Sequence, residues 1–175
     1  MTKNEPDSPK GQLLIKGDRT TIIFRRTLHH PPAVVWQAIT DPAELKHWLM
    51  CSYAKIDGRT GGDLEMIAGP SQFHVKGKIL KWDPPHVFEH EWKVEPVAEM
   101  PRGENAIFRY ELTRENGSTI LKVTYRQLTR RTAAGFLPGT HVLLHRLESQ
   151  LAKEQLPDWM TEFQKACTDY PAWDE

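Results

Sequence analysis

The sequence predicts an α+β domain in which one curved antiparallel sheet encloses a cavity against a long C-terminal helix. Three segments predict this fold. Residues 24–48 are a β-type run that ends at two prolines and continues into two short helices separated by Asp41-Pro42. Residues 57–62 and 77–85 each contain Gly, Pro and Asp in patterns typical of turns. In this order, the segments place a pair of short helices after the first strand of the sheet.

The first strand and the helix pair follow from local patterns. Residues 20–30 alternate apolar and polar side chains, which is typical of a half-buried strand. Pro32 suits the first turn of a helix, and Asp41 can cap a second helix that has Pro42 at its first position. Leu45 and Trp48 then form the buried stripe of the second helix.

Further strands are expected between turn signals, and Asn116-Gly117 is the clearest hairpin turn because it joins two alternating runs. These strands are residues 52–56, 63–67, 72–82, 87–94, 106–113 and 119–127.

The last long helix is expected to begin near Pro138. Leucines at 143 or 144, 147 and 151 recur at helical spacing, while charged residues occupy the other side. Residues 1–18 are polar, with two prolines and two glycines, and are expected to be a flexible leader. Residues 19–156 form the main domain, and the aromatic residues 157–175 form an extension that packs on it.

Composition excludes several classes of protein. The chain has 175 residues, and 23 Lys and Arg balance 23 Asp and Glu, so no overall charge draws it to nucleic acid or an anionic membrane. No apolar run is long enough for membrane insertion, and residues 1–18 lack the apolar core of a signal peptide. Cys51 and Cys167 are too few and too far apart for a disulfide scaffold. We expect a cytoplasmic protein.

Three motifs together resemble a known superfamily. Val35-Trp36, Ala38, Thr40-Asp41-Pro42, Leu45 and Trp48 form its helix-pair motif, residues 57–62 its glycine turn, and residues 77–85 its strand and proline turn. The sequence resembles the START-related (SRPBCC) superfamily and, within it, the family similar to the C-terminal domain of the activator of heat-shock protein 90 ATPase. The resemblance implies a helix-grip fold, in which a curved antiparallel sheet wraps around a long C-terminal helix.

The last long helix contains a candidate set of metal ligands. His141, His145 and Glu148 are spaced so that one helical face presents two imidazoles and a carboxylate, a workable zinc set. The intervening residues lack the general-base Glu of the zinc-protease pattern, and leucines occupy the buried side of this helix. A solvated polar face is therefore the favoured interpretation, and no metal or other cofactor is expected.

No catalytic residue is assigned. His86 and His90 share strand parity with apolar residues, but a hydrogen-bonded structural histidine is the favoured interpretation for both. Arg26 falls on the apolar face of the first strand. Cys51 has no activating group nearby in the sequence and is expected to be a buried, inert thiol.

A sheet curved around one helix encloses space in which apolar ligands bind. Side chains that share inward parity on the strands and on the last helix are expected to line that space, and Gly77 is expected to leave room for a guest. The expected lining is Phe73, Val75, Gly77, His90, Trp92, Phe108, Tyr110, Leu144 and Leu147.

We expect a non-enzymatic protein whose partner is a small, mostly apolar molecule held in the central cavity. A cyclase, aromatase or hydrolase is the first alternative, because the superfamily that the sequence resembles includes such enzymes. It would require a buried ionisable pair in the cavity with strongly shifted pKa values. A protein-interaction module with a chaperone or other protein partner is the second alternative. Formation of a homodimer stays open.

Overall fold

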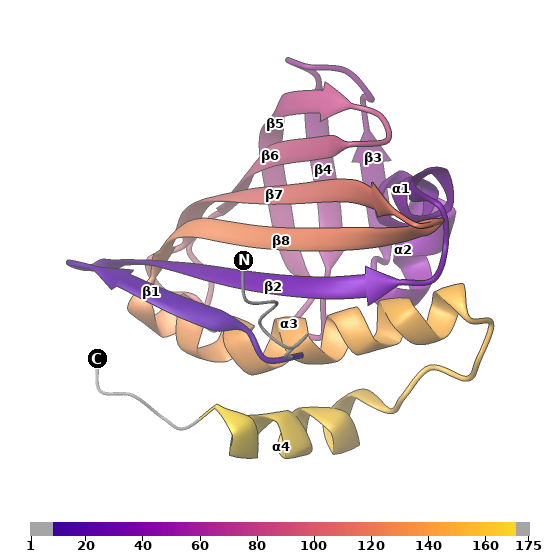
Figure 1. Cartoon of the computed structure of the whole chain (residues 1–175). Helices are drawn as coiled ribbons and strands as arrows, with labels where there is room; N and C mark the ends of the chain where they lie inside the picture. Colours follow the sequence, from indigo (N-terminus) through magenta and orange to yellow (C-terminus); the bar gives the residue numbers. More distant parts are fainter. Residues whose placement is uncertain (1–8, 171–175) are drawn as a thin grey trace.

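The computed structural model describes residues 9–170, which form one antiparallel sheet of eight strands and four helices (Figure 1). The helix-grip α+β fold expected from the sequence is confirmed. In chain order the elements are β1 (Gln12–Lys16), β2 (Arg19–Leu28), α1 (Pro32–Thr40), α2 (Pro42–Trp48), β3 (Tyr53–Ile56), β4 (Asp63–Ala68), β5 (Phe73–Asp83), β6 (Val87–Val94), β7 (Glu104–Glu115), β8 (Ser118–Thr129), α3 (Arg130–Leu151) and α4 (Trp159–Asp169).

The strand order is β1-β2-β8-β7-β6-β5-β4-β3, so β2 pairs with the last strand while β3 lies at the opposite edge. The helix pair α1 and α2 carries the chain across this distance. Figure 1 shows the sheet curving around α3, with α4 on the side of α3 that faces away from the sheet. No helix among residues 9–170 is long and apolar enough to cross a membrane.

Alternation along the strands gives the sheet one apolar, concave face. In β7 the side chains of Phe108, Tyr110 and Leu112 are buried, while the residues between them are partly exposed. The β7–β8 hairpin turns at Asn116-Gly117, and both residues have the positive φ that this type of turn requires. The concave face is therefore the one expected from the sequence.

The helix pair also forms as its sequence predicts. The side chain of Asp41 caps α2 by accepting a hydrogen bond from the Ala43 N–H at 2.9 Å. The indole Nε1 of Trp48 donates to the Ala38 carbonyl of α1 at 2.8 Å, which ties the two short helices together. Trp48 is only 2% exposed.

The expected start of the long helix was wrong. α3 begins at Arg130, directly after β8, and Pro138 lies inside it. The side chain of Thr129 caps the helix by accepting from the Thr132 N–H at 3.3 Å, a signal that the proline obscured. Pro138 has no N–H to donate to the Ala134 carbonyl, but Ala134 is exposed, so water can satisfy that carbonyl.

The expected flexible leader also needs correction. Residues 12–16 form the edge strand β1, which pairs with β2 through a tight turn at Gly17-Asp18. Gly17 has φ +62, which suits this turn, and a Gly-Asp pair between two strands is a hairpin signal that the polar composition masked. Residues 1–8 of the leader and 171–175 of the extension, including Trp173, lie outside the described residues.

We predict that Trp48→Ala lowers the free energy of unfolding by roughly 3–5 kcal/mol, as for other buried large aromatic residues. The substitution removes a buried indole and its hydrogen bond between the helices. Chemical denaturation followed by circular dichroism measures the change. Val34→Ala on α1, where Val34 is 42% exposed, is the matched control and should change stability little. Equal stabilities for the two variants would show that Trp48 does not anchor the helix pair.

Candidate ligand-binding cavity

A cavity of about 1350 Å³ lies between the concave face of the sheet and the helices α2, α3 and α4. Its middle is apolar and aromatic, with walls from β4 to β8 on one side and from α3 and α4 on the other. One end is polar, because the β1–β2 turn, the β6–β7 loop and the start of α3 meet there. The cavity thus has a body suited to an apolar guest and one end suited to water.

Stacked rings form the wall on the sheet. The Trp92 and Phe108 rings have centroids 5.0 Å apart and planes at 13°, and Phe108 stacks on Tyr125 at 3.6 Å and 18°. Phe136 of α3 meets Trp92 edge-on, with centroids 5.2 Å apart. Trp92, Phe108 and Tyr125 lie on the neighbouring strands β6, β7 and β8, and Phe108 pairs directly with Tyr125. The wall is therefore set by strand register and alternation.

His90 places a hydrogen-bond acceptor in this aromatic wall. It pairs with Phe108 across β6 and β7 and is 3% exposed. Its Nδ1 donates to the Glu91 carbonyl at 2.8 Å, which leaves Nε2 unprotonated in the neutral ring. Burial lowers the pKa of His90 to about 4, so the ring is neutral near pH 7.

Two tyrosines supply hydroxyl groups to the same cavity. The hydroxyl oxygens of Tyr110 and Tyr125 are 3.1 Å apart, and both residues line the cavity. Burial raises the pKa of Tyr110 to about 12, and burial also raises the pKa of Tyr125 well above its ordinary value. Both hydroxyls are therefore protonated near neutral pH, and since one donates to the other, one proton of the pair is left over.

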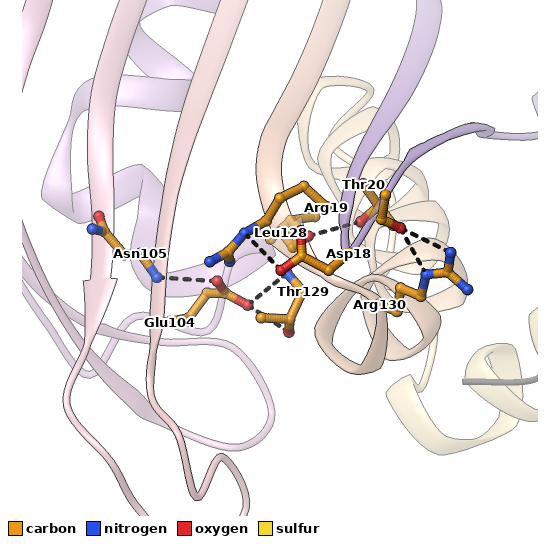
Figure 2. Close-up of polar contacts among 9 residues, drawn as sticks. Asp18, Arg19, Thr20, Glu104, Asn105, Leu128, Thr129 and Arg130 are labelled. Carbon is orange, nitrogen blue, oxygen red and sulfur yellow. Dashed lines mark hydrogen bonds and ion pairs between the residues drawn. The ribbon is translucent and has the colours of Figure 1, made fainter.

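A hydrogen-bond network braces the polar end (Figure 2). The carboxylate of Glu104, at the start of β7, accepts from the Asn105 N–H at 3.0 Å. It also accepts from the N–H and the hydroxyl of Thr129 at 3.2 and 3.0 Å. The Arg130 guanidinium donates to the Gly17 carbonyl, with a shortest distance of 2.8 Å. These contacts fix the first turn of α3 against β7 and the β1–β2 turn.

Five of the residues expected to line a cavity do so: Phe73, His90, Trp92, Phe108 and Tyr110. Val75, Leu144 and Leu147 are instead buried in the core and do not line the cavity. The sequence left open whether Leu143 or Leu144 faces the cavity, and the structure places Leu143 in its lining.

Gly77 does not leave room for a guest. A Cβ there would lie 2.2 Å from the Glu91 carbonyl oxygen, so the glycine permits close approach of β6 to β5. The expectation of open space at Gly77 was wrong.

Several residues that line the cavity were not predicted from the sequence to do so. Phe136 lies in the part of α3 that precedes Pro138, where no helix was expected, and Gly139 directly follows Pro138 and was not among the expected lining residues. Trp159, Met160 and Phe163 belong to α4. The aromatic composition of residues 157–175 indicated packing on the domain but not a role in the cavity wall.

The other candidate residues lie outside the cavity. His141, His145 and Glu148 interact with Tyr170, Glu162 and Arg26 respectively. Within residues 9–170, no group of three or more metal-ligating side chains is placed to hold an ion.

The remaining two candidates, His86 and Cys51, do not line the cavity either. His86 is exposed in the turn between β5 and β6. Burial raises the pKa of the Cys51 thiol to about 12, so this cysteine is protonated near neutral pH, in line with the inert thiol expected from the sequence.

Comparison with known proteins adds a family and a fold. The family described as "Activator of Hsp90 ATPase homolog 1-like protein" matches residues 29–152. CalU16 from Micromonospora echinospora has a similar crystal structure, with 21% identity, 92% of each chain covered and a TM-score of 0.67. Protein MLL2253 from Mesorhizobium loti is similar with 20% identity, 78% of this chain and 99% of that chain covered, and a TM-score of 0.67.

PFC0360w, an HSP90 activator from Plasmodium falciparum, is similar with 21% identity and a TM-score of 0.59, covering 75% of this chain and 96% of that chain. These likenesses show the fold. Among curated proteins, no sequence matches this chain.

We predict that His90 makes the protein less stable as the pH falls. Its folded pKa of about 4 lies below the unfolded value near 6.5, so the unfolded state binds the extra proton first and is favoured as the pH drops. This effect costs about 2 kcal/mol between pH 7 and pH 5. Urea denaturation of the parent and of His90→Phe at both pH values measures it. The variant should lose less stability than the parent, and equal losses would contradict the assignment of a buried neutral ring.

Proposed function

The chain belongs to the activator of Hsp90 ATPase homolog 1-like family, and we propose that it binds a small, mostly apolar molecule in the cavity between the sheet and the C-terminal helices. The observation that carries this proposal is the aromatic wall of Trp92, Phe108 and Tyr125, which faces about 1350 Å³ of space rather than packed side chains. Large apolar pockets with a few polar groups are the usual sites of small-molecule binding.

The size of the hydrophobic effect makes such binding feasible. Each buried CH₂ group contributes about 0.8 kcal/mol, and micromolar affinity corresponds to about 8 kcal/mol. A guest with ten or so buried carbon atoms supplies roughly that much before the cost of immobilising it is subtracted. The cavity is large enough for a guest of this size.

An enzyme on this scaffold is the first alternative. The cavity does contain buried groups with strongly shifted pKa values, His90 and the pair Tyr110 and Tyr125. Acid–base catalysts work best with a pKa near the working pH, whereas burial moves the pKa of His90 well below that range and the pKa values of both tyrosines well above it. They are suited to making hydrogen bonds as neutral groups, which favours binding over acid–base chemistry.

A protein-interaction module is the second alternative, because the family takes its description from an activator of a chaperone. The surface feature that favours it is the edge strand β1, where Leu14 and Ile15 are 56% and 48% exposed. An exposed edge strand can pair with a strand of another protein. The ligand-binding proposal ranks ahead of this one because many apolar side chains line the cavity, whereas β1 exposes two.

We predict that the apolar fluorescent probe N-phenyl-1-naphthylamine binds at one site per chain and that Gly139→Leu blocks it. Gly139 lines the cavity, and a Cβ there would be in ordinary contact with Trp159 at 3.7 Å, so a longer side chain enters the space. Fluorescence titration should show at least tenfold weaker binding. Leu143→Trp fills the same cavity from the next turn of α3 and should act likewise.

Ala134→Leu is the matched control, since it enlarges an exposed residue of the same helix. It should bind the probe as the parent does. If folded Gly139→Leu and Leu143→Trp variants both bind the probe with the parent's affinity, the cavity is not the binding site. If the parent itself binds no apolar probe, the interaction module becomes the better hypothesis.

A further inference from the structure

We infer that the cavity selects a planar aromatic guest that carries a hydroxyl group, with the hydroxyl donating a hydrogen bond to Nε2 of His90 and the Tyr110–Tyr125 pair donating to an oxygen of the guest. This inference rests on the proposed binding function and specifies the chemical class of its ligand. It comes from three properties of the wall: an acceptor without a partner, a spare hydroxyl proton, and stacked rings.

The acceptor is Nε2 of His90. Donation from Nδ1 to the Glu91 carbonyl fixes the tautomer, so Nε2 carries a lone pair. No residue in the described part of the chain bonds to Nε2. Among those residues, Gln150 Oε1 is the only side-chain nitrogen or oxygen that is both fully buried and without a hydrogen-bond partner. Nε2 of His90 also has no partner, so it is not fully buried. Since His90 lines the cavity and is 3% exposed, Nε2 is reached from the cavity.

An acceptor in this position discriminates between guests. The rings of Phe88, Phe108 and Tyr110 lie within 6.5 Å of the imidazole, centroid to centroid, so little water competes there. A guest that covers Nε2 with a CH group removes its water without replacing the hydrogen bond. Such a loss weakens binding, whereas a hydroxyl group at the same place avoids it.

The donor is the tyrosine pair. Tyr110 and Tyr125 share one hydrogen bond at 3.1 Å, and the second hydroxyl proton has no acceptor among residues 9–170. Both rings line the cavity, and the Tyr110 ring lies nearly parallel to that of His90, at 22°. A guest oxygen beside His90 can therefore accept a hydrogen bond from this pair. A hydroxyl oxygen serves both roles because it donates one hydrogen bond and accepts others.

The planar shape follows from the stacked wall. Trp92, Phe108 and Tyr125 stack on one another, and Phe136 meets Trp92 edge-on, so the lining already consists of aromatic rings in stacked and edge-on contact. Aromatic rings attract one another beyond the effect of buried area when they meet in stacked or edge-on geometries. A flat aromatic body beside these rings is favoured over a branched aliphatic body of equal area.

Two probes of nearly equal size test the inference: 2-naphthol and 2-methylnaphthalene, each measured by displacement of N-phenyl-1-naphthylamine. The parent should bind 2-naphthol at least tenfold more tightly. His90→Phe should abolish this preference and keep the affinity for 2-methylnaphthalene, because only the acceptor is lost. The double variant Tyr110→Phe/Tyr125→Phe should reduce the preference in the same way, because a single substitution would leave the other hydroxyl proton free to donate. His86→Phe, which alters an exposed histidine outside the cavity, is the control and should keep it.

The outcomes separate the two proposals. If neither probe binds the parent, the proposed function itself fails. If the parent binds both probes equally, or if folded His90→Phe keeps the preference, ligand binding stands and the selection of a hydroxyl group is overturned. Should His90→Phe not fold, ¹⁵N NMR of the parent decides: the Nε2 resonance should shift with 2-naphthol and not with 2-methylnaphthalene, and equal responses would refute the inference.

Discussion

The structure depends on a mismatch between a broad, curved sheet and the single long helix that crosses it. α3 lies against β2 and β8 at one side of the sheet. The concave face continues through β7, β6, β5 and β4, and α3 reaches it there through side chains such as Phe136, which meets Trp92 of β6 edge-on. Large aromatic side chains and the residues of α4 line the remaining space without filling it. The cavity is therefore a consequence of sheet width and curvature.

The sheet and the helix pair could be predicted because their signals are local. Asp41 as a cap and Asn116-Gly117 as a hairpin turn are short-range features whose meaning does not depend on distant residues. Strand parity likewise placed Phe73, Trp92 and Phe108 on the concave face, where they line the cavity.

Features that depend on contacts between distant segments could not be predicted in this way. A glycine in the middle of a strand suggests free space beside it, but at Gly77 the Glu91 backbone occupies that space. The early start of α3 depends on the Thr129 cap, which Glu104 of β7 also holds in place. The tautomer of His90 is set by a backbone carbonyl, which composition and periodicity do not reveal.

α4 lies outside the segment that the family model matches. The family match spans residues 29–152, whereas α4 comprises Trp159–Asp169. Trp159 and Phe163 stack on each other with centroids 5.4 Å apart, and both line the cavity from outside the matched segment. Part of the wall that a guest would touch is thus supplied by this extension, while the aromatic and polar groups of the sheet lie within the matched segment.

The most direct test of ligand binding in the cavity is to locate a bound guest by NMR. Intermolecular nuclear Overhauser effects between the methyl protons of 2-methylnaphthalene and ring protons of the 20.2 kDa protein can be measured with selectively labelled aromatic residues. If the guest binds in the cavity, we expect contacts to Trp92, Phe108 and Phe136, which surround the middle of the cavity. Contacts confined to exposed apolar residues such as Leu14 and Ile15 on β1 would contradict it.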